Sequence, residues 1–581
     1  MRARKYFVAL FLILLAARLC HIDILWAEED LPMAAAKQVQ FGKTLYRDVW
    51  FDKPPLLAWQ YLAWGVRAGW VLRLVGAVYA LIACMLVYGL ASELWSQREG
   101  YWAAGLLGFF LIFDFPSAVI PLAADLTMLV PHLAAVWLAF RGKAFWSGVL
   151  AGVAFLVNTK ALFVLAACAI WCFPTVVALA GGFLAATAIG AACLAWGGAL
   201  GPYVDQVWRW GFLYAGSTFL AHPVRDGVIR TANWLGFHSA LVVAAICHRW
   251  EDRHRWKLLA WAAISLGAAM LGWRFFPRYF FQVLPALVIM GAYGMVRLGR
   301  WRALALALLL IPLIRFGPRY VLLARDLATG QAHRWSDVAM DQDSQAAARI
   351  VGEMARPGDT LYVWGFRPEL FVYTGLPAAT RFLDSQALTG VPADRHLTQS
   401  APVGSDFTRR NREELARSRP TLILDGLSLY NPALAMERYP ELRAWLAQYR
   451  EVSRTRAIVI YRLAASPAGS ALLEERSAAD ITRLTRPHSA AVFASIISPV
   501  TSISKARLRP MARVRATMGV VQNRPIFTPG VAKVARSEAI ARSQVDTNGH
   551  PAAVTMSMAE PDQGVRRGRG RPPISAKITI A

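Results

Sequence analysis

The sequence predicts an α-helical polytopic membrane protein, followed by a small soluble α/β domain and a disordered basic tail. Of its 581 residues, 56% are hydrophobic and only 17% are charged, whereas an average soluble domain carries about 25% charged residues. The mean hydropathy is +0.37. Long apolar stretches recur up to residue 314 and then stop. These observations exclude an ordinary soluble enzyme and place the membrane part in the N-terminal half.

The apolar stretches predict about 11 transmembrane helices, several of them short. A helix needs about 20 mostly apolar residues to cross a bilayer, because every backbone polar group must be satisfied within the segment. The predicted spans are Tyr6–Trp26, Trp70–Ala91, Tyr101–Phe115, Leu122–Phe140, Phe145–Val157, Ala161–Pro174, Val177–Leu200, Trp234–His248, Leu258–Trp273, Tyr279–Val296 and Ala303–Ile314.

Lysine and arginine predict the orientation of these spans, because cytoplasmic loops carry an excess of both. An N-terminus inside the cell puts the basic loops on one side, and an odd number of spans then places everything after residue 316 outside. The formal net charge of +26 partly reflects this orientation. The basic loops are Arg2–Lys5, Arg98, Arg141–Lys143, Arg249–Lys257 and Arg297–Arg302.

Beyond the last span the pattern changes to that of a soluble domain. We expect a membrane domain over 1–320, an extracytoplasmic α/β domain over 321–465 and a tail over 466–581. No phosphate-binding glycine loop follows any of the expected strands. The α/β pattern consists of an amphipathic helix at Asp341–Ala355, strands at Thr360–Gly365, Thr380–Leu383, Thr421–Asp425 and Ala457–Leu463, and a helix at Glu441–Tyr449.

The tail is rich in Ala, Ser, Arg and Pro and has no hydrophobic periodicity, which predicts disorder. Within it, Arg566–Pro573 resembles an AT-hook, whose Arg-Gly-Arg-Pro core can lie in a narrow minor groove. Because the predicted orientation places this tail outside the cytoplasm, we do not expect nucleic acid as a partner.

The loop after the first span carries the residues best suited to chemistry. Glu28, Glu29 and Asp30 lie at the outer end of that span, where burying charge is expensive. A short helix from Pro32 to Phe41, begun by Asp30 and ended by Gly42, should follow. Candidate bases and phosphate-binding cations therefore gather at one membrane face. The remainder of the loop is Tyr46-Arg47-Asp48 and then Asp52-Lys53-Pro54-Pro55.

This loop resembles the first periplasmic loop of GT-C superfamily glycosyltransferases, in the branch of protein O-mannosyltransferases and aminoarabinose transferases. That family has an acidic pair after the first span, a short helix ending in Gly, Tyr-Arg-Asp-like residues and an acidic-Lys-Pro-Pro motif. Weaker matches follow in the expected order over Met1–Leu313. They are Pro121–Asp125, Gly148–Lys160 and Arg274–Pro285.

The resemblance implies a multi-pass enzyme of the bacterial cytoplasmic (inner) membrane. It would pass a sugar from a polyprenyl phosphate to an extracytoplasmic acceptor, namely a glycolipid, a cell-envelope polysaccharide or a protein, with inversion. A carboxylate takes the acceptor proton, and cations stabilise the departing phosphate. The resemblance implies no cofactor beyond the lipid-phosphate sugar, and no His/Asp cluster predicts a metal. Membrane lipids are the other expected partners.

The candidate base is Glu28 first, because spacing back from Gly42 puts it where the family has Asp. Asp30 is second and Glu29 third. Asp125 would orient the acceptor or assist the base, or else act as a helix cap or salt-bridge partner. Lys160 would bind substrate or only snorkel, and Tyr279 would touch substrate or belong to the aromatic belt. The substrate-binding candidates are Lys53, Arg47, Asp52, Tyr46, Arg274, Arg278, Tyr279 and Lys160.

Two other classes of function remain open from the sequence. A transporter or flippase for a lipid-linked saccharide would carry its charges deep in the membrane and often shows paired halves, and neither feature is present. A non-catalytic envelope scaffold would not need Lys53 beside three carboxylates. Nothing in the sequence identifies the sugar, the acceptor or the length of the carrier lipid.

Overall fold

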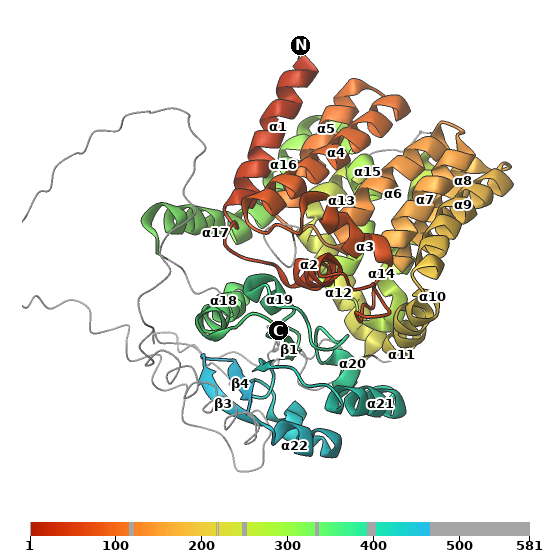
Figure 1. Cartoon of the computed structure of the whole chain (residues 1–581). Coiled ribbons are helices and arrows are strands. Elements are labelled where there is room, and N and C mark those ends of the chain that lie inside the picture. Colours follow the sequence, from red (N-terminus) through yellow and green to blue (C-terminus); the bar gives the residue numbers. More distant parts are fainter. Residues whose placement is uncertain are drawn as a thin grey trace, which may run out of the picture. The chain divides into compact units, whose positions relative to one another are not determined.

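The computed structural model describes residues 2–114, 121–216, 218, 220–246, 253–331, 336–391 and 402–464. The N-terminal part is helical, and Figure 1 shows its long helices side by side. The helices of this part are α1 (Arg2–Leu19), α2 (Ala27–Gln40), α3 (Pro55–Trp59), α4 (Trp70–Leu94), α5 (Gln97–Ile112), α6 (Ala124–Phe140), α7 (Ala144–Val157), α8 (Leu162–Cys172), α9 (Val176–Trp196), α10 (Leu200–Tyr203), α11 (Trp210–Ala215), α12 (Pro223–Phe237), α13 (Ser239–Ile246), α14 (Arg255–Met270), α15 (Leu284–Arg297), α16 (Arg302–Leu308) and α17 (Leu310–Thr329).

The helical part fits a membrane protein. Every predicted span overlaps a helix, although the number of crossings stays a prediction. α12 begins 11 residues before the predicted span at Trp234, and α17 runs through the predicted domain boundary at 320/321. Four helical stretches in the described residues are long and apolar enough to cross a bilayer, and shorter apolar helices accompany them. The four are Trp70–Leu94, Val176–Trp196, Arg255–Trp273 and Gly299–Thr329.

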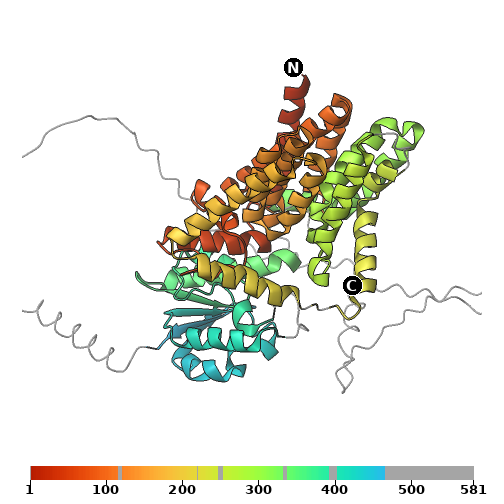
Figure 2. The same ribbon diagram turned by 90° about the vertical axis from the view of Figure 1, so that its right-hand side faces the viewer.

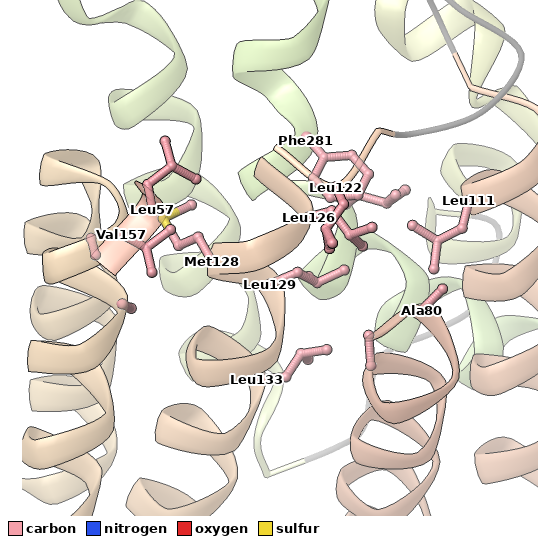
Figure 3. Packing of buried hydrophobic residues seen from close by; sticks show 14 of the residues in the cluster. Leu57, Ala80, Leu111, Leu122, Leu126, Met128, Leu129, Leu133, Val157 and Phe281 are labelled. Carbon is pink, nitrogen blue, oxygen red and sulfur yellow. The ribbon is translucent and has the colours of Figure 1, made fainter. Parts of the chain in front are cut away.

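The core of the helical part is centred on α6, which has apolar side chains on opposite faces. Figure 3 shows Leu126, Leu129 and Leu133 directed toward Ala80 of α4, while Met128 points away from them. All five side chains are buried. Because helical residues three and four positions apart share a face, this one helix packs against neighbours on two sides.

Close packing of α7 and α9 depends on glycine. A Cβ on Gly182 would collide with the backbone carbonyl of Phe145, and one on Gly148 would collide with the carbonyl of Leu179. Gly181, one position earlier, has nothing within 4 Å of the place its Cβ would occupy. Small residues let transmembrane helices approach until their backbones touch, so Gly182 sets the distance between these two helices.

A four-stranded sheet forms the second part, with strand order β1-β2-β4-β3. β1 pairs in parallel with β2, in the register Leu361↔Leu422, and the other neighbours are antiparallel. The expected strand at Thr380–Leu383 does not form; only an isolated bridge between Leu361 and Ala378 lies near it. The strands are β1 (Leu361–Trp364), β2 (Leu422–Asp425), β3 (Tyr449–Arg454) and β4 (Val459–Leu463).

Helices cover both faces of this sheet (Figure 2). The helices of this part are α18 (Ser336–Met354), α19 (Glu369–Thr374), α20 (Gln386–Thr389), α21 (Ser405–Ala416) and α22 (Pro440–Leu446). Leu361 and Val363 belong to one buried cluster with Val351 of α18, whereas Tyr362 and Trp364 belong to another that includes α21 and α22 residues. This alternation follows from the two-residue period of a strand.

The α/β domain contacts the loop that follows the first helix. The backbone N–H of Ala378 donates to Oε1 of Gln38 at 2.7 Å, and the N–H of Trp50 donates to the carbonyl of Arg381 at 2.6 Å. Nearer α1, the N–H of Leu25 donates to the Asp341 carboxylate at 3.3 Å. The domain is therefore joined to the polypeptide stretch that carries the candidate base.

Replacing Gly182 by Ala should destabilise the protein, while the same change at Gly181 should not. The new methyl group at 182 meets backbone, so α7 and α9 must separate, which costs about 1–3 kcal/mol. Both changes carry the same gain in helix propensity. Thermal unfolding of the purified protein would measure the difference, and equal midpoints for the two variants would contradict the packing argument.

Candidate active site

The acidic residues after the first span belong to α2, which begins earlier than the sequence predicts. Asp30 does not start the helix, because Trp26 has the extended backbone of an N-cap and Ala27 is the first helical residue. Carboxylates in a first turn are favoured by the helix dipole. Gly42 follows the helix with a φ of +86°, a conformation that favours glycine.

Helix geometry sends the three carboxylates in different directions, since successive side chains lie about 100° apart. Glu28 faces a cavity together with Leu31 and Pro32, three and four residues later. Glu29 and Asp30 are fully buried on the other faces. One Asp30 oxygen accepts the N–H of Leu31 at 2.6 Å. Of the three candidate bases, only Glu28 lines the cavity.

Glu29 forms a buried ion pair with Arg73 of α4. Both carboxylate oxygens lie 3.0 Å from Nη1 of Arg73, and Glu29 also accepts the N–H of Leu122 at 2.7 Å. The other nitrogens of Arg73 donate to the carbonyls of His21 at 3.0 Å and Ile24 at 2.6 Å. Glu29 thus fixes α2 to the start of α4 and to the segment before α6.

The cavity has a volume of about 260 Å³ and is lined mainly by the helical part. Three carboxylates and four cations line it, which leaves one net positive charge. Two of its lining residues, Phe366 and Gln386, come from the α/β domain. The charged lining residues are Glu28, Asp52, Asp125, Lys53, Lys160, Arg274 and Arg278.

Lys53 is held in place at its backbone carbonyl and at its side-chain ammonium. Its carbonyl accepts the Tyr46 hydroxyl at 2.6 Å, and its ammonium lies 2.7 Å from Oδ2 of Asp52. Burial lowers the pKa of Lys53, but Asp52, with further help from Tyr214 and Glu28, outweighs this and raises it. The side chain is 44% exposed and borders the cavity. Lys53 therefore stays protonated where an anion would enter.

The backbone around Lys53 is fixed by Gln206, a residue that no sequence motif indicated. Its amide nitrogen donates to the carbonyl of Tyr46 at 2.7 Å, and its oxygen accepts the N–H of Phe51 at 2.9 Å. Tyr46 is itself buried, with a φ of +68°. Tyr46 thus holds the backbone of Lys53 in place through its hydroxyl and does not line the cavity.

The opposite wall brings further cations toward Glu28. Arg278 forms an ion pair with Glu28, and Asp125 interacts electrostatically with both. The ammonium of Lys160 lies 3.1 Å from the ring centroid of Tyr279. Two elements distant in sequence, α6 and the segment before α15, therefore converge on one carboxylate.

Arg274 reaches the cavity from a strained stretch of chain. Its neighbours Trp273 and Phe275 have φ values of +51° and +47°, and each such residue costs about 1–3 kcal/mol. The guanidinium donates to the carbonyl of Tyr214 at 3.0 Å and lies over its ring at 3.9 Å. Tyr214 lines the cavity with Trp210, one helical turn before it.

Six of the eight substrate-binding residues predicted from the sequence line this cavity, and Tyr46 and Arg47 do not. Arg47 is exposed and pairs with its neighbour Asp48 at 2.8 Å. Sequence reasoning missed Tyr214, Phe366 and Gln386. The four-residue spacing of Trp210 and Tyr214 was the available signal for the first, whereas no sequence feature places the other two. The predicted residues that line the cavity are Glu28, Asp52, Lys53, Asp125, Lys160, Arg274, Arg278 and Tyr279.

Within the described part of the chain, no group of three His, Cys, Asp or Glu side chains lies close enough to form a metal site. Carboxylate and cationic side chains line the cavity. Such a set can accept a proton and can hold an anion.

The fold is similar to that of a solved structure of ArnT. It matches the apo crystal structure of ArnT from Cupriavidus metallidurans with a TM-score of 0.50 at 14% identity, over 79% of this chain and 98% of that one. For ArnT bound to undecaprenyl phosphate the TM-score is 0.48 at 16% identity, with the same coverage. For the oligosaccharyltransferase AglB from Archaeoglobus fulgidus it is 0.40 at 11%, over 80% of this chain and 75% of that one. No protein-family model and no curated protein sequence matches the chain.

Replacing Arg73 by Gln should strongly destabilise the protein, because it leaves the Glu29 charge buried without its partner. Breaking a buried pair in this way costs about 3–5 kcal/mol. Arg141→Gln is the matched control, since Arg141 pairs with Glu93 and both side chains are at least one-third exposed. Such surface pairs are worth about 0–1 kcal/mol.

Thermal unfolding in detergent would compare the two arginine variants. The double change Glu29→Gln with Arg73→Gln should recover part of the loss, because the Glu29 charge is then no longer buried without Arg73. Similar midpoints for Arg73→Gln and Arg141→Gln would show that the buried pair does not hold α2.

Proposed function

We propose that the protein is an integral membrane glycosyltransferase that transfers a sugar from a polyprenyl-phosphate donor to an extracytoplasmic acceptor. The observation that carries this proposal is the cavity, where Glu28 lies among four cations at the end of a GT-C-type helical bundle. The ArnT structure bound to undecaprenyl phosphate has the same general fold and supports this class of donor.

In the proposed reaction the Glu28 carboxylate accepts the proton of an acceptor hydroxyl. The acceptor oxygen forms a bond to the anomeric carbon as the bond from that carbon to the phosphate oxygen breaks. Polyprenyl phosphate leaves with the electron pair of that bond, and the single displacement inverts the anomeric configuration. Proton transfer by a positioned carboxylate contributes about 10²–10⁴-fold to such a rate.

Lys53 and Arg278 are the proposed ligands of the departing phosphate, with Arg274 and Lys160 nearby. Negative charge grows on this oxygen in the transition state, so fixed cations stabilise the transition state more than the ground state. Arg278 pairs with Glu28 in the structure, so a bound phosphate would compete for this arginine. Asp125, which lies near both, is the proposed orienting group for the acceptor.

The protein O-mannosyltransferase and aminoarabinose-transferase branch, and the bacterial inner membrane, belong to this proposal. So does the orientation with a cytoplasmic N-terminus, which the basic loops support. The charged cavity lies at helix ends and loops, and a transporter would instead carry its charges near mid-membrane.

Transfer of label from a panel of radiolabelled polyprenyl-phosphate sugars into total membranes tests this function. Glu28→Gln should lower kcat about 10²–10⁴-fold while donor binding persists, because only the proton acceptor is lost. Lys53→Ala should also lower kcat, by about 10²–10³-fold. Arg47→Gln is the matched control from the same loop and should keep full activity.

Donor binding without transfer for any sugar in wild-type membranes would favour a transporter or a scaffold. Full activity of Glu28→Gln would remove this residue from its role and return Asp30 and Glu29 to consideration. Loss of activity in Arg47→Gln would show that the active site includes residues beyond those that line this cavity.

Phe366 is the proposed acceptor-side contact of the α/β domain, because it is the aromatic member of the two lining residues that come from this domain. Phe366→Ala should raise KM for the acceptor by up to about tenfold, since an aromatic contact is worth about 0.5–1.5 kcal/mol. KM for the donor should not change. Tyr430→Ala, at an exposed position of the same domain, is the control, and a matching rise in donor KM would contradict the assignment.

A further inference from the structure

A second cavity, of about 630 Å³, lies far from the charged site. It is lined by Tyr6 of α1, by residues of α5 from Arg98 to Phe109, by Val296 of α15, by Arg302 of α16 and by Leu309. Figure 1 shows the N-terminal end of α1 away from α2, where the candidate base lies. Its lining comprises aromatic side chains, aliphatic side chains and two arginines, Arg98 and Arg302.

The charged side chains that line this cavity are basic. Among the described residues that line it, none is acidic. Arg302 donates to the carbonyls of Met295 at 2.5 Å and Val296 at 2.7 Å, so its guanidinium is fixed without a carboxylate. Arg98 is exposed at the start of α5. The neighbouring acid Glu99 is already paired with Arg297 at 2.6 Å. The two arginines thus present uncompensated positive charge at the mouth of an apolar space.

The remainder of the cavity suits a hydrocarbon chain. Trp102, Leu106 and Phe109 follow one another along α5, and Leu309 contributes from the other side. The adjacent helix α16 has the exposed apolar side chains Leu304 and Leu306, as expected of a surface that faces lipid. A ligand that fits must therefore combine an anionic group with an apolar chain.

We propose that this cavity binds an anionic phospholipid of the leaflet on the basic side of the protein. Arg98 and Arg302 hold the headgroup phosphate, and one acyl chain lies against Leu106, Phe109 and Leu309. Basic residues next to membrane helices attract anionic lipid by about 1 kcal/mol each. Arg4 and Lys5 are exposed at the same end of α1 and add to the attraction. The site is independent of the proposed transfer reaction.

Lipid retention in native mass spectrometry, together with thermal unfolding in nanodiscs, tests this site in the full-length protein. Wild type should retain phosphatidylglycerol in preference to phosphatidylcholine and unfold at a higher temperature in phosphatidylglycerol. The double variant R98Q/R302Q should bind phosphatidylglycerol about thirtyfold more weakly. Lys143→Gln, an exposed change of the same charge on the same predicted side, should behave as wild type.

For each variant, lipid retention and unfolding temperature are compared between phosphatidylglycerol and phosphatidylcholine. A loss of stability that is equal in both lipids therefore does not affect the comparison. R98Q alone serves as a second variant, because this exposed side chain leaves the fold intact. Equal retention of both lipids by wild type would overturn the proposal, as would undiminished preference in R98Q/R302Q. Equal stabilisation by inorganic phosphate in phosphatidylcholine would also overturn it, in favour of a site for a soluble anion.

Discussion

The buried ion pair between Arg73 and Glu29 is the constraint on which the site depends. It joins the start of α4, the start of α2 and, through the N–H of Leu122, the chain before α6. Arg73 also binds two carbonyls after α1. Glu28 lies next to Glu29 in the same helical turn, so its direction is fixed by a pair that takes no part in the chemistry. Buried charges of this kind are tolerated only when fully paired, which makes the arrangement all-or-none.

The formal charge of the cavity suits the lipid-phosphate sugar that we propose as donor. Its four cations and three carboxylates leave one net positive charge. A phosphodiester donor carries one negative charge, and the departing phosphate gains a second as its bond breaks. The cations therefore interact more strongly with the transition state than with the bound donor, which is the condition for catalysis. A site with balanced charge would bind the donor more weakly and gain less as the reaction proceeds.

Hydrophobic patterning made the helical part predictable, because each apolar stretch can satisfy its backbone only as a helix. The resemblance to GT-C glycosyltransferases, carried by motifs in order along the chain, selected Glu28, Lys53 and Arg278. It ranked Glu28 above Asp30 and Glu29 but did not show which of them faces the cavity. Side-chain direction depends on helix phase, and the helix was predicted to begin at Pro32, whereas α2 begins at Ala27. Phe366 was unpredictable for another reason: its place at the cavity follows from contacts between domains, such as Gln38 with Ala378, that leave no local pattern.

Arg274 shows that part of the site is positioned in the absence of ligand. Its two neighbours hold positive φ angles, a strain that persists only where surrounding contacts over-determine the backbone. Those contacts include the carbonyl and ring of Tyr214. Binding a phosphate then requires little reordering of this arginine, so less of the interaction energy is lost to conformational entropy. Packing that forms during folding thus offsets the strain at 273 and 275, so the free energy of binding the proposed donor would remain available for the transition state.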